Sequence, residues 1–303
     1  MSRDRPRTEA EPATNGDDID GDAPVDAEDG APVIEEGRYV YCVVRTDDDA
    51  TFETTGIEDE PVSLVTAAGV GAVVHRCDEV YDSADVGTIR RWIVRHQSVV
   101  DDATERFDTP LPFQFDTIVR GDDEAVREWL TDERERLTES LDSLAGHREY
   151  RIEVRRTEPV ADDRLEADDD RLAELAMRID DAGEGTAFLL EKQYDRRVTE
   201  LRRARREALT ADVRERLTTH AREVHELERS PGATLAGVGE GEGADRETVC
   251  RLTLLAHLER EGEIGAVLDD VAAEPGLEVR FTGPWPPYTF APAFGADDGA
   301  NEG

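Results

Sequence analysis

The stretch "RYVYCVV" (Arg38–Val44) decides the fold class, because β-branched and aromatic residues fill it almost without interruption. A second apolar run, "AGVGAVVH" (Ala68–His75), follows after a connection that contains glycine, aspartate and proline. Two such runs separated by turn-forming residues predict two strands of one sheet. We therefore expect ordered structure to begin at Arg38 with a β-sheet.

The segment that follows has helical periodicity. Its apolar residues recur at steps of three and four, which places them on one side of a helix. These residues are Ile89, Trp92, Ile93, His96, Val100, Ala103 and Phe107. The pattern predicts a helix that lies against the sheet.

Three further elements complete the first half of the chain. The run "LPFQFDTIV" (Leu111–Val119) alternates and predicts a third strand. Asp122 is a good N-terminal residue for a second helix that Gly146 would end. "EYRIEVRR" (Glu149–Arg156) predicts a fourth strand. This order favours a mixed or antiparallel sheet with helices on one face, an α+β sandwich of the ferredoxin-like kind.

The second half has stronger helical signals and fewer strands. An acidic linker (Pro159–Asp170) precedes a long periodic stretch from Thr186 to Leu227, which would span roughly 60 Å as one helix and could break near Thr210. A small sheet and one more helix are expected after it. They correspond to the strands "TVCRLTLLAHL" (Thr248–Leu258) and "GLEVRF" (Gly276–Phe281) and the helix from Ile264 to Val271.

These patterns predict an α+β protein with two α/β sandwich domains. Residues 1–36 contain twelve acidic residues and three arginines without periodicity, and predict a disordered acidic arm. We expect a ferredoxin-like N-terminal α+β domain over residues 37–157 and a C-terminal domain with long helices and a small sheet over residues 158–294. Residues 295–303 predict a disordered tail.

Charge is the dominant property of the composition. The 303 residues include 73 acidic and 36 basic side chains, for a formal net charge of -37, and Lys192 is the only lysine. A surface of this sign repels phosphate backbones and anionic membranes, so neither partner is expected. Charge repulsion of this size is best tolerated in concentrated salt, which is typical of a halophile. With no apolar run long enough for a membrane span or a signal peptide, we expect a cytoplasmic protein.

The stretch "TGPWPPYTF" (Thr282–Phe290) is unusual in this chain. Its three prolines make it stiff and extended, and two interpretations are open: a docking surface of aromatic side chains, or a strap over an apolar surface. We favour the strap and expect Trp285 to be buried. The residues of this signature are Gly283, Pro284, Trp285, Pro286, Pro287 and Tyr288.

Candidate catalytic residues are few. His96 could act as a general base, but no nucleophile or orienting partner is placed beside it by the sequence. The six histidines lack metal-binding spacing, and Cys42, Cys77 and Cys250 are isolated in apolar runs, as buried thiols are. "GEGEGA" (Gly239–Ala244) fits a dinucleotide motif in letters only, since its glutamates would repel a pyrophosphate. No catalytic residue, metal or cofactor is predicted.

One feature opposes the overall charge. The stretch "RRVTELRRARRE" carries six arginines on the long helix. They could form a solvated helix face that pairs with the acidic first domain, or a surface that binds an acidic protein partner. The candidate partner-binding residues are Arg196, Arg197, Arg202, Arg203, Arg205 and Arg206.

Taken together, seven motifs resemble the gas vesicle protein GvpL/GvpF family in order and approximate spacing. They are "RYVYCVV", "GVGAVVH", "RRWIVRHQSVVD", "TPLPFQFDTIV", "EYRIEV", "GTAFLLEK" and, as the most specific, "FTGPWPPYTF". The resemblance covers roughly residues 38–293, and the length of the chain favours the longer GvpL type.

The resemblance implies an accessory protein of gas vesicle assembly with two α/β domains and no enzymatic activity. Its partners would be the small hydrophobic shell protein and other accessory gas vesicle proteins, with which it would act as a chaperone-like factor or a minor component of the vesicle. Two alternatives stay open: a small-molecule enzyme with His96 in its site, and a ligand-sensing domain on the ferredoxin-like sandwich.

Overall fold

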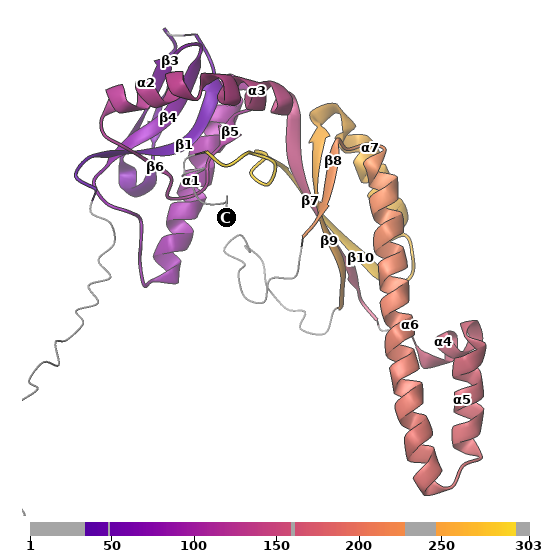
Figure 1. The fold of residues 1–303 in the computed structure, drawn as a ribbon. Helices are drawn as coiled ribbons and strands as arrows, with labels where there is room; N and C mark the ends of the chain where they lie inside the picture. The colour runs from indigo at the N-terminus through magenta and orange to yellow at the C-terminus, as the bar shows by residue number, and fades with distance from the viewer. Residues whose placement is uncertain (1–33, 48, 159–160, 228–246, 295–303) are drawn as a thin grey trace, which may run out of the picture.

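The computed structural model describes residues 34–47, 49–158, 161–227 and 247–294. Most of the predicted acidic arm (1–36), the predicted tail (295–303) and the glycine-rich stretch Gly239–Ala244 lie outside the described residues. The chain has a mixed α and β architecture with two antiparallel sheets, which agrees with the expected class. Figure 1 shows the sheets in succession and a helical arm that extends away from the second sheet. The ferredoxin-like arrangement of the first domain stays a prediction.

The first sheet has the strand order β2-β3-β4-β1-β5, and β6 also pairs with β1. Its strands are β1 (Gly37–Arg45), β2 (Glu53–Thr55), β3 (Pro61–Ala67), β4 (Val70–Cys77), β5 (Leu111–Pro112) and β6 (Ile118–Arg120). The two predicted strands around Arg38 and Val70 are confirmed. The sequence analysis missed β2 and β3, which lie with a short 3-10 helix (Ile57–Asp59) in the segment that we interpreted as a connection.

The central strand β1 is buried on both faces, which explains its continuous apolar sequence. Tyr39 and Tyr41 face one side and Val40 and Val43 the other. The register with β4 shifts between Val40 and Cys42, so an irregularity lets Tyr41 and Cys42 both pack on the tyrosine side.

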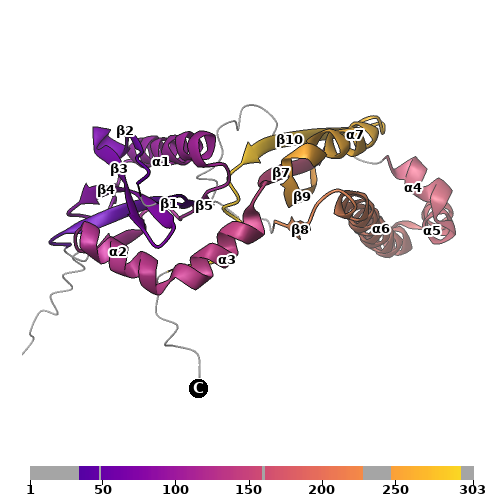
Figure 2. The ribbon, with the colours of Figure 1, turned by 90° about the horizontal axis from the view of Figure 1, so that it is seen from above.

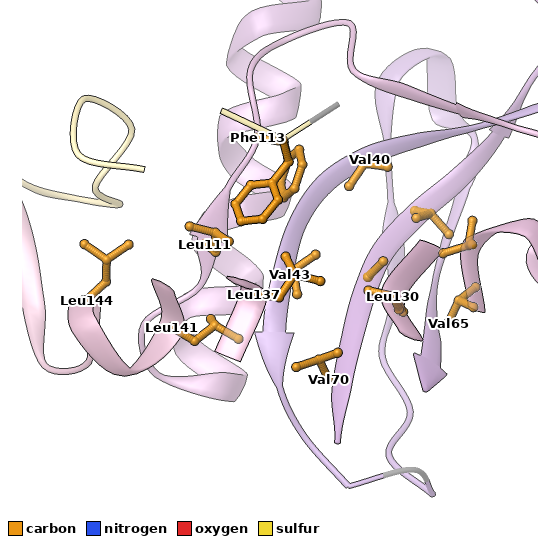
Figure 3. Close-up of a cluster of buried hydrophobic side chains, with 14 of the residues drawn as sticks. Val40, Val43, Val65, Val70, Leu111, Phe113, Leu130, Leu137, Leu141 and Leu144 are labelled. Carbon is orange, nitrogen blue, oxygen red and sulfur yellow. The ribbon is translucent and has the colours of Figure 1, made fainter. Parts of the chain in front are cut away.

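Helices cover both faces of this sheet, and the prediction of helices on one face is wrong. The predicted helix α1 (Val86–Phe107) is confirmed and is capped by the Asp85 carboxylate, which accepts from the backbone nitrogens of Gly87 and Thr88. It packs on the Tyr39 side, whereas α2 (Asp123–Asp132) and α3 (Arg134–Leu144) lie on the opposite side (Figure 2). Figure 3 shows leucines of α2 and α3 pointing toward Val40 and Val43.

Two predicted elements are divided in the structure. The single helix expected after Asp122 is two helices, α2 (Asp123–Asp132) and α3 (Arg134–Leu144), which meet at Glu133. The run Leu111–Val119 is not one strand, because the chain turns at Asp116 (φ 66°) between β5 and β6. The alternation of apolar residues from Leu111 to Val119 continues across this turn, so the pattern alone could not reveal it.

The second sheet has the order β10-β7-β9-β8. Its strands are β7 (His147–Arg156), β8 (Glu223–Glu226), β9 (Glu247–His257) and β10 (Leu277–Trp285). We expected β7 to complete the first sheet, and this prediction is wrong: β7 pairs with β9 and β10. Helix α7 (Glu261–Ala272), which follows a 3-10 turn (Leu258–Arg260), packs on one face with the last turns of α6 (Glu184–Thr218).

Helices α4 (Asp162–Asp168), α5 (Asp170–Asp180) and α6 (Glu184–Thr218) form the arm (Figure 1). The predicted linker therefore contains a helix. Helix α6 does not break at Thr210, but it ends at Thr218, and the last part of the predicted long helix is strand β8. Leu165, Leu172 and Val198 make a small separate core where the three helices meet.

Candidate functional site

His96 belongs to a buried network of tyrosines and histidines between β1 and α1. The Tyr39 hydroxyl lies 2.8 Å from His96 Nδ1, and the Tyr41 hydroxyl lies 2.7 Å from His75 Nδ1. The other ring nitrogen of His75 lies 2.9 Å from the Tyr81 hydroxyl. Backbone nitrogens donate to two of these hydroxyls, so the network ties β1 to its neighbours.

This environment suits a structural role for His96 better than catalysis. His96 is only 3% exposed, and burial lowers its pKa to about 4, as it does for His75. Burial also raises the pKa of Tyr39 far above its usual range. A general base must reach its substrate. Aromatic side chains surround His96, including Tyr41, Phe115 and Tyr288.

Within the part of the chain that the structure describes, the remaining candidates for chemistry give no catalytic arrangement. Cys42, Cys77 and Cys250 are free and buried, as predicted, and burial raises the pKa of the Cys250 thiol to about 11. A cleft of about 620 Å³ between α6 and β9 is lined by Cys250 and by charged residues such as Arg206 and Glu207, and it contains no histidine. It supplies no activated nucleophile.

Two further observations concern the described parts of the chain only. No helix among them has the length and apolar character that a membrane span requires. Nor do three or more histidine, cysteine, aspartate or glutamate side chains gather there in a way that could hold a metal ion.

The signature Thr282–Phe290 begins as the edge strand of the second sheet. Trp285 pairs with Glu149 of β7, and its side chain points outward, since the residue is 39% exposed. The prediction that Trp285 is buried is wrong, and Pro286 and Pro287 are buried instead. Gly283 (φ +131°) is required, because a Cβ there would lie 2.8 Å from the Glu149 carbonyl oxygen.

Beyond Pro287 the chain crosses to the first sheet. Tyr288 packs among the tyrosines of β1, with its ring 6.2 Å from that of His96. Phe290 and Phe294 pack against the opposite, leucine-rich core, where the Phe294 ring lies 5.6 Å from that of Phe113. We call residues 286–294 the C-terminal strap. It fastens the two halves together.

A buried carboxylate holds the C-terminal strap at its middle. Glu149 of β7 is fully buried, and its Oε2 accepts from the Thr289 backbone nitrogen at 2.7 Å. Its Oε1 accepts from the Thr289 hydroxyl at 2.9 Å and from Arg151 Nε at 3.0 Å. Buried carboxylates need several partners of this kind. The sequence analysis missed Glu149, since an acidic residue in an alternating strand is ordinarily exposed.

The six candidate arginines divide into two groups. Four of them join α6 to other elements: Arg197 pairs with Asp169 (2.6 Å), Arg202 with Asp162 (2.8 Å), Arg205 with Asp168, and Arg206 with Glu247 (3.1 Å). The acidic partners belong to α4, to the N-cap of α5 and to β9. One of the two interpretations was pairing with the first domain, but these partners lie in the second half of the chain.

Arg196 and Arg203 form the second group. They pair within α6, with Glu200 at 3.1 Å and Glu207 at 2.7 Å, and their side chains are 82% and 72% exposed. Three large apolar residues nearer the tip of the arm are also exposed, namely Met177, Phe188 and Leu189. The sequence analysis did not single them out. The sequence did contain a signal for two of these exposed residues. Phe188 and Leu189 lie outside the apolar stripe of the helix, which continues through Leu190, Tyr194 and Val198.

Comparison with known proteins finds relatives that are gas vesicle proteins of the L type. The chain is 45% identical to gas vesicle protein L2 of Halobacterium salinarum over 269 residues, which cover 88% of this chain and 95% of that protein. It is 37% identical to gas vesicle protein L of Haloferax mediterranei over 292 residues, which cover 86% of this chain and 89% of the relative.

Solved structures share the fold. The crystal structure of the gas vesicle protein GvpF from Anabaena matches with a TM-score of 0.65 at 20% identity, covering 86% of this chain and all of that one. GvpF from Microcystis aeruginosa matches with a TM-score of 0.58, also at 20% identity, over 85% of this chain and 99% of that one. The model of the gas vesicle synthesis protein GvpL/GvpF family matches residues 37–292. The resemblance drawn from the seven motifs is therefore confirmed, and the chain belongs to the GvpL/GvpF family.

Proposed function

We propose that this protein is an accessory factor of gas vesicle assembly. It binds the small hydrophobic shell protein and other accessory gas vesicle proteins, either as a chaperone-like factor or as a minor component of the vesicle, and it acts in the cytoplasm and at the vesicle. The supporting observation is the arm, which carries exposed Phe188 and Leu189 and exposed cations away from the two sheets. Exposed apolar groups of this size are typical of protein-binding surfaces.

The candidate partner-binding residues remain the six arginines, but we assign different roles to two groups of them. Arg197, Arg202, Arg205 and Arg206 support the shape of the arm through ion pairs. Arg196 and Arg203 form their ion pairs within α6 and are the better candidates to contact a partner. The enzyme and ligand-sensing alternatives have weaker support, since His96 is enclosed by aromatic rings.

We also propose that the chain forms two domains, each built around one sheet. The strand β7 would then belong to the second domain, so the boundary would lie near Gly146 rather than after residue 157. The C-terminal strap would join the domains. Limited proteolysis with mass spectrometry tests this boundary, because domains resist cleavage better than the segments between them.

The function is tested by deleting the gene and examining the cells by electron microscopy. We expect absent or malformed gas vesicles and normal growth, with vesicles restored by a plasmid copy of the gene. A His96→Asn copy, if it folds, should restore them too, because the proposal assigns no chemistry to this residue. Normal vesicles in the deletion strain, in a background without related genes of the same family, would refute the proposal.

A further inference from the structure

The exposed side of α6 carries an unusual combination of residues. Phe188, Leu189, Lys192, Arg196 and Arg203 are all exposed and recur at helical spacing, and we call them the outer face of α6. Phe188 and Leu189 are 58% and 62% exposed, and Lys192 Nζ lies 5.7 Å from the centre of the Phe188 ring. The outer face is thus apolar at the tip of the arm and basic farther along.

This face is not needed to hold the arm together. The apolar contacts of α6 with α4 and α5 come from the other side of the helix, through Tyr194, Val198 and Leu201. Arg196 shares the carboxylate of Glu200 with Arg197. Among the described residues, Arg196 and Arg203 pair within α6, with Glu200 and Glu207, and Lys192 is exposed near them, so these three cations bridge to no other element.

We propose that the outer face of α6 binds an acidic amphipathic helix of another gas vesicle protein. Apolar residues at one end of that helix pack on Phe188 and Leu189, and carboxylates along it pair with Lys192, Arg196 and Arg203. The proposal rests on the proposed function and names the chemistry of its partner. From Phe188 to Arg203 the face is about 22 Å long, which a helix of roughly 15 residues would cover.

Charge complementarity favours this occupant over others. Arginine pairs with carboxylates through two parallel hydrogen bonds, so Arg196 and Arg203 select an acidic surface. A twofold dimer through the same face would place its cations against their own copies, which disfavours a second copy of this chain. A purely apolar partner would leave the three cations without a role and would desolvate them.

The experiment measures binding of the full-length protein to each purified gas vesicle protein of the same gene cluster, at about 1 M potassium chloride, where the Debye length is about 3 Å. One variant combines Phe188→Ser with Leu189→Ser, and a second combines Arg196→Glu with Arg203→Glu. The matched control combines Arg90→Glu with Arg95→Glu on exposed positions of α1. Circular dichroism verifies that all three keep their helices.

We expect one partner with an acidic helix to bind the wild type and the α1 control equally, and each α6 variant at least about tenfold more weakly. Glu→Arg changes in the partner helix should restore binding to the Arg196→Glu/Arg203→Glu variant. Equal binding of wild type and α6 variants would overturn this inference and leave the assembly role intact. Failure of the wild type to bind any gas vesicle protein would instead count against both. A dimer lost only in the α6 variants would identify a second copy as the occupant.

Discussion

The C-terminal strap and the helical arm are secured by opposite means. The strap inserts Tyr288, Phe290 and Phe294 into two cores and fixes its middle to a buried carboxylate. The arm has a core of three residues and relies on ion pairs such as Arg205 with Asp168. Apolar burial contributes far more free energy than partly exposed ion pairs. The strap is therefore built for stability, and the arm leaves apolar and charged groups exposed, which the proposed function assigns to contact with other proteins.

The largest effect is expected at Tyr288. Tyr288→Ala should lower the free energy of unfolding by about 3–5 kcal/mol, because it leaves a cavity between the strap and the tyrosines of β1. Tyr288→Phe is the matched control. The Tyr288 hydroxyl is buried and has no hydrogen-bond partner among the described residues, so its removal should cost little. Urea unfolding of both variants in high salt measures the difference, and similar losses for the two would contradict a packing role.

The next largest effect is a loss of stability in mild acid. Burial lowers the pKa of His75 and His96 to about 4, below their usual value of about 6.5, so the folded state favours the neutral rings. Below pH 6.5 the unfolded chain binds protons that the folded chain does not, and stability falls until about pH 4. At pH 5 the loss should be on the order of 2 kcal/mol per histidine relative to pH 7.

Nuclear magnetic resonance separates these histidines from the many carboxylates that also titrate in acid. The ring signals of His75 and His96 should stay those of neutral imidazole down to about pH 5. Protonation of the two buried rings near pH 6.5 would show that they are accessible to water. The enzyme alternative with His96 would then regain support.

A smaller effect is expected in the arm. Arg205→Gln removes the ion pair with Asp168 and should cost less than about 1 kcal/mol, because such partly exposed pairs contribute little. Hydrogen exchange should show faster opening of α4 and unchanged protection of the two sheets. If instead the whole protein were destabilised by several kcal/mol, the arm and the sheets would have to unfold together, and the contrast drawn above would not hold.

The smallest effect on stability is expected at Trp285. Trp285→Ala should lower the free energy of unfolding by less than about 0.5 kcal/mol, because its side chain is exposed at an edge strand. A thermal melt beside Tyr288→Ala compares two aromatic residues of one motif. A loss as large as that of Tyr288→Ala would return Trp285 to the core, where the sequence analysis placed it.

Elements with a clear period were predictable. Helices α1 and α7 agree with their patterns, because each buries one face and exposes the other. Strand β9 agrees with its nearly continuous apolar run, which is buried on both faces. The assignment of β7 to the wrong sheet had a different cause. Alternation in β7 tells which residues are buried, but it contains no information on which strands pair with it. The division of helix 123–144 at Glu133 likewise left the apolar stripe almost uninterrupted.

The candidate site was predictable only in part. The six arginines were recognised from their clustering, but their division depended on which side of α6 faces α4 and α5, and that is a tertiary property. In the signature, the prediction that Trp285 is buried was wrong, whereas Tyr288 does pack against a core. Three positions separate Trp285 from Tyr288, and the chain leaves the edge strand between them, so one ring faces solvent and the other a core.

The position of the C-terminal strap in the gene has a consequence for synthesis. Residues 286–294 leave the ribosome more than a hundred positions after Leu144, so on the order of ten seconds of translation pass before Phe294 can cover Phe113. During that interval the nascent chain exposes the flank of its first sheet. A prematurely terminated product would expose it permanently, and protein quality control could use that surface to distinguish truncated chains from finished ones.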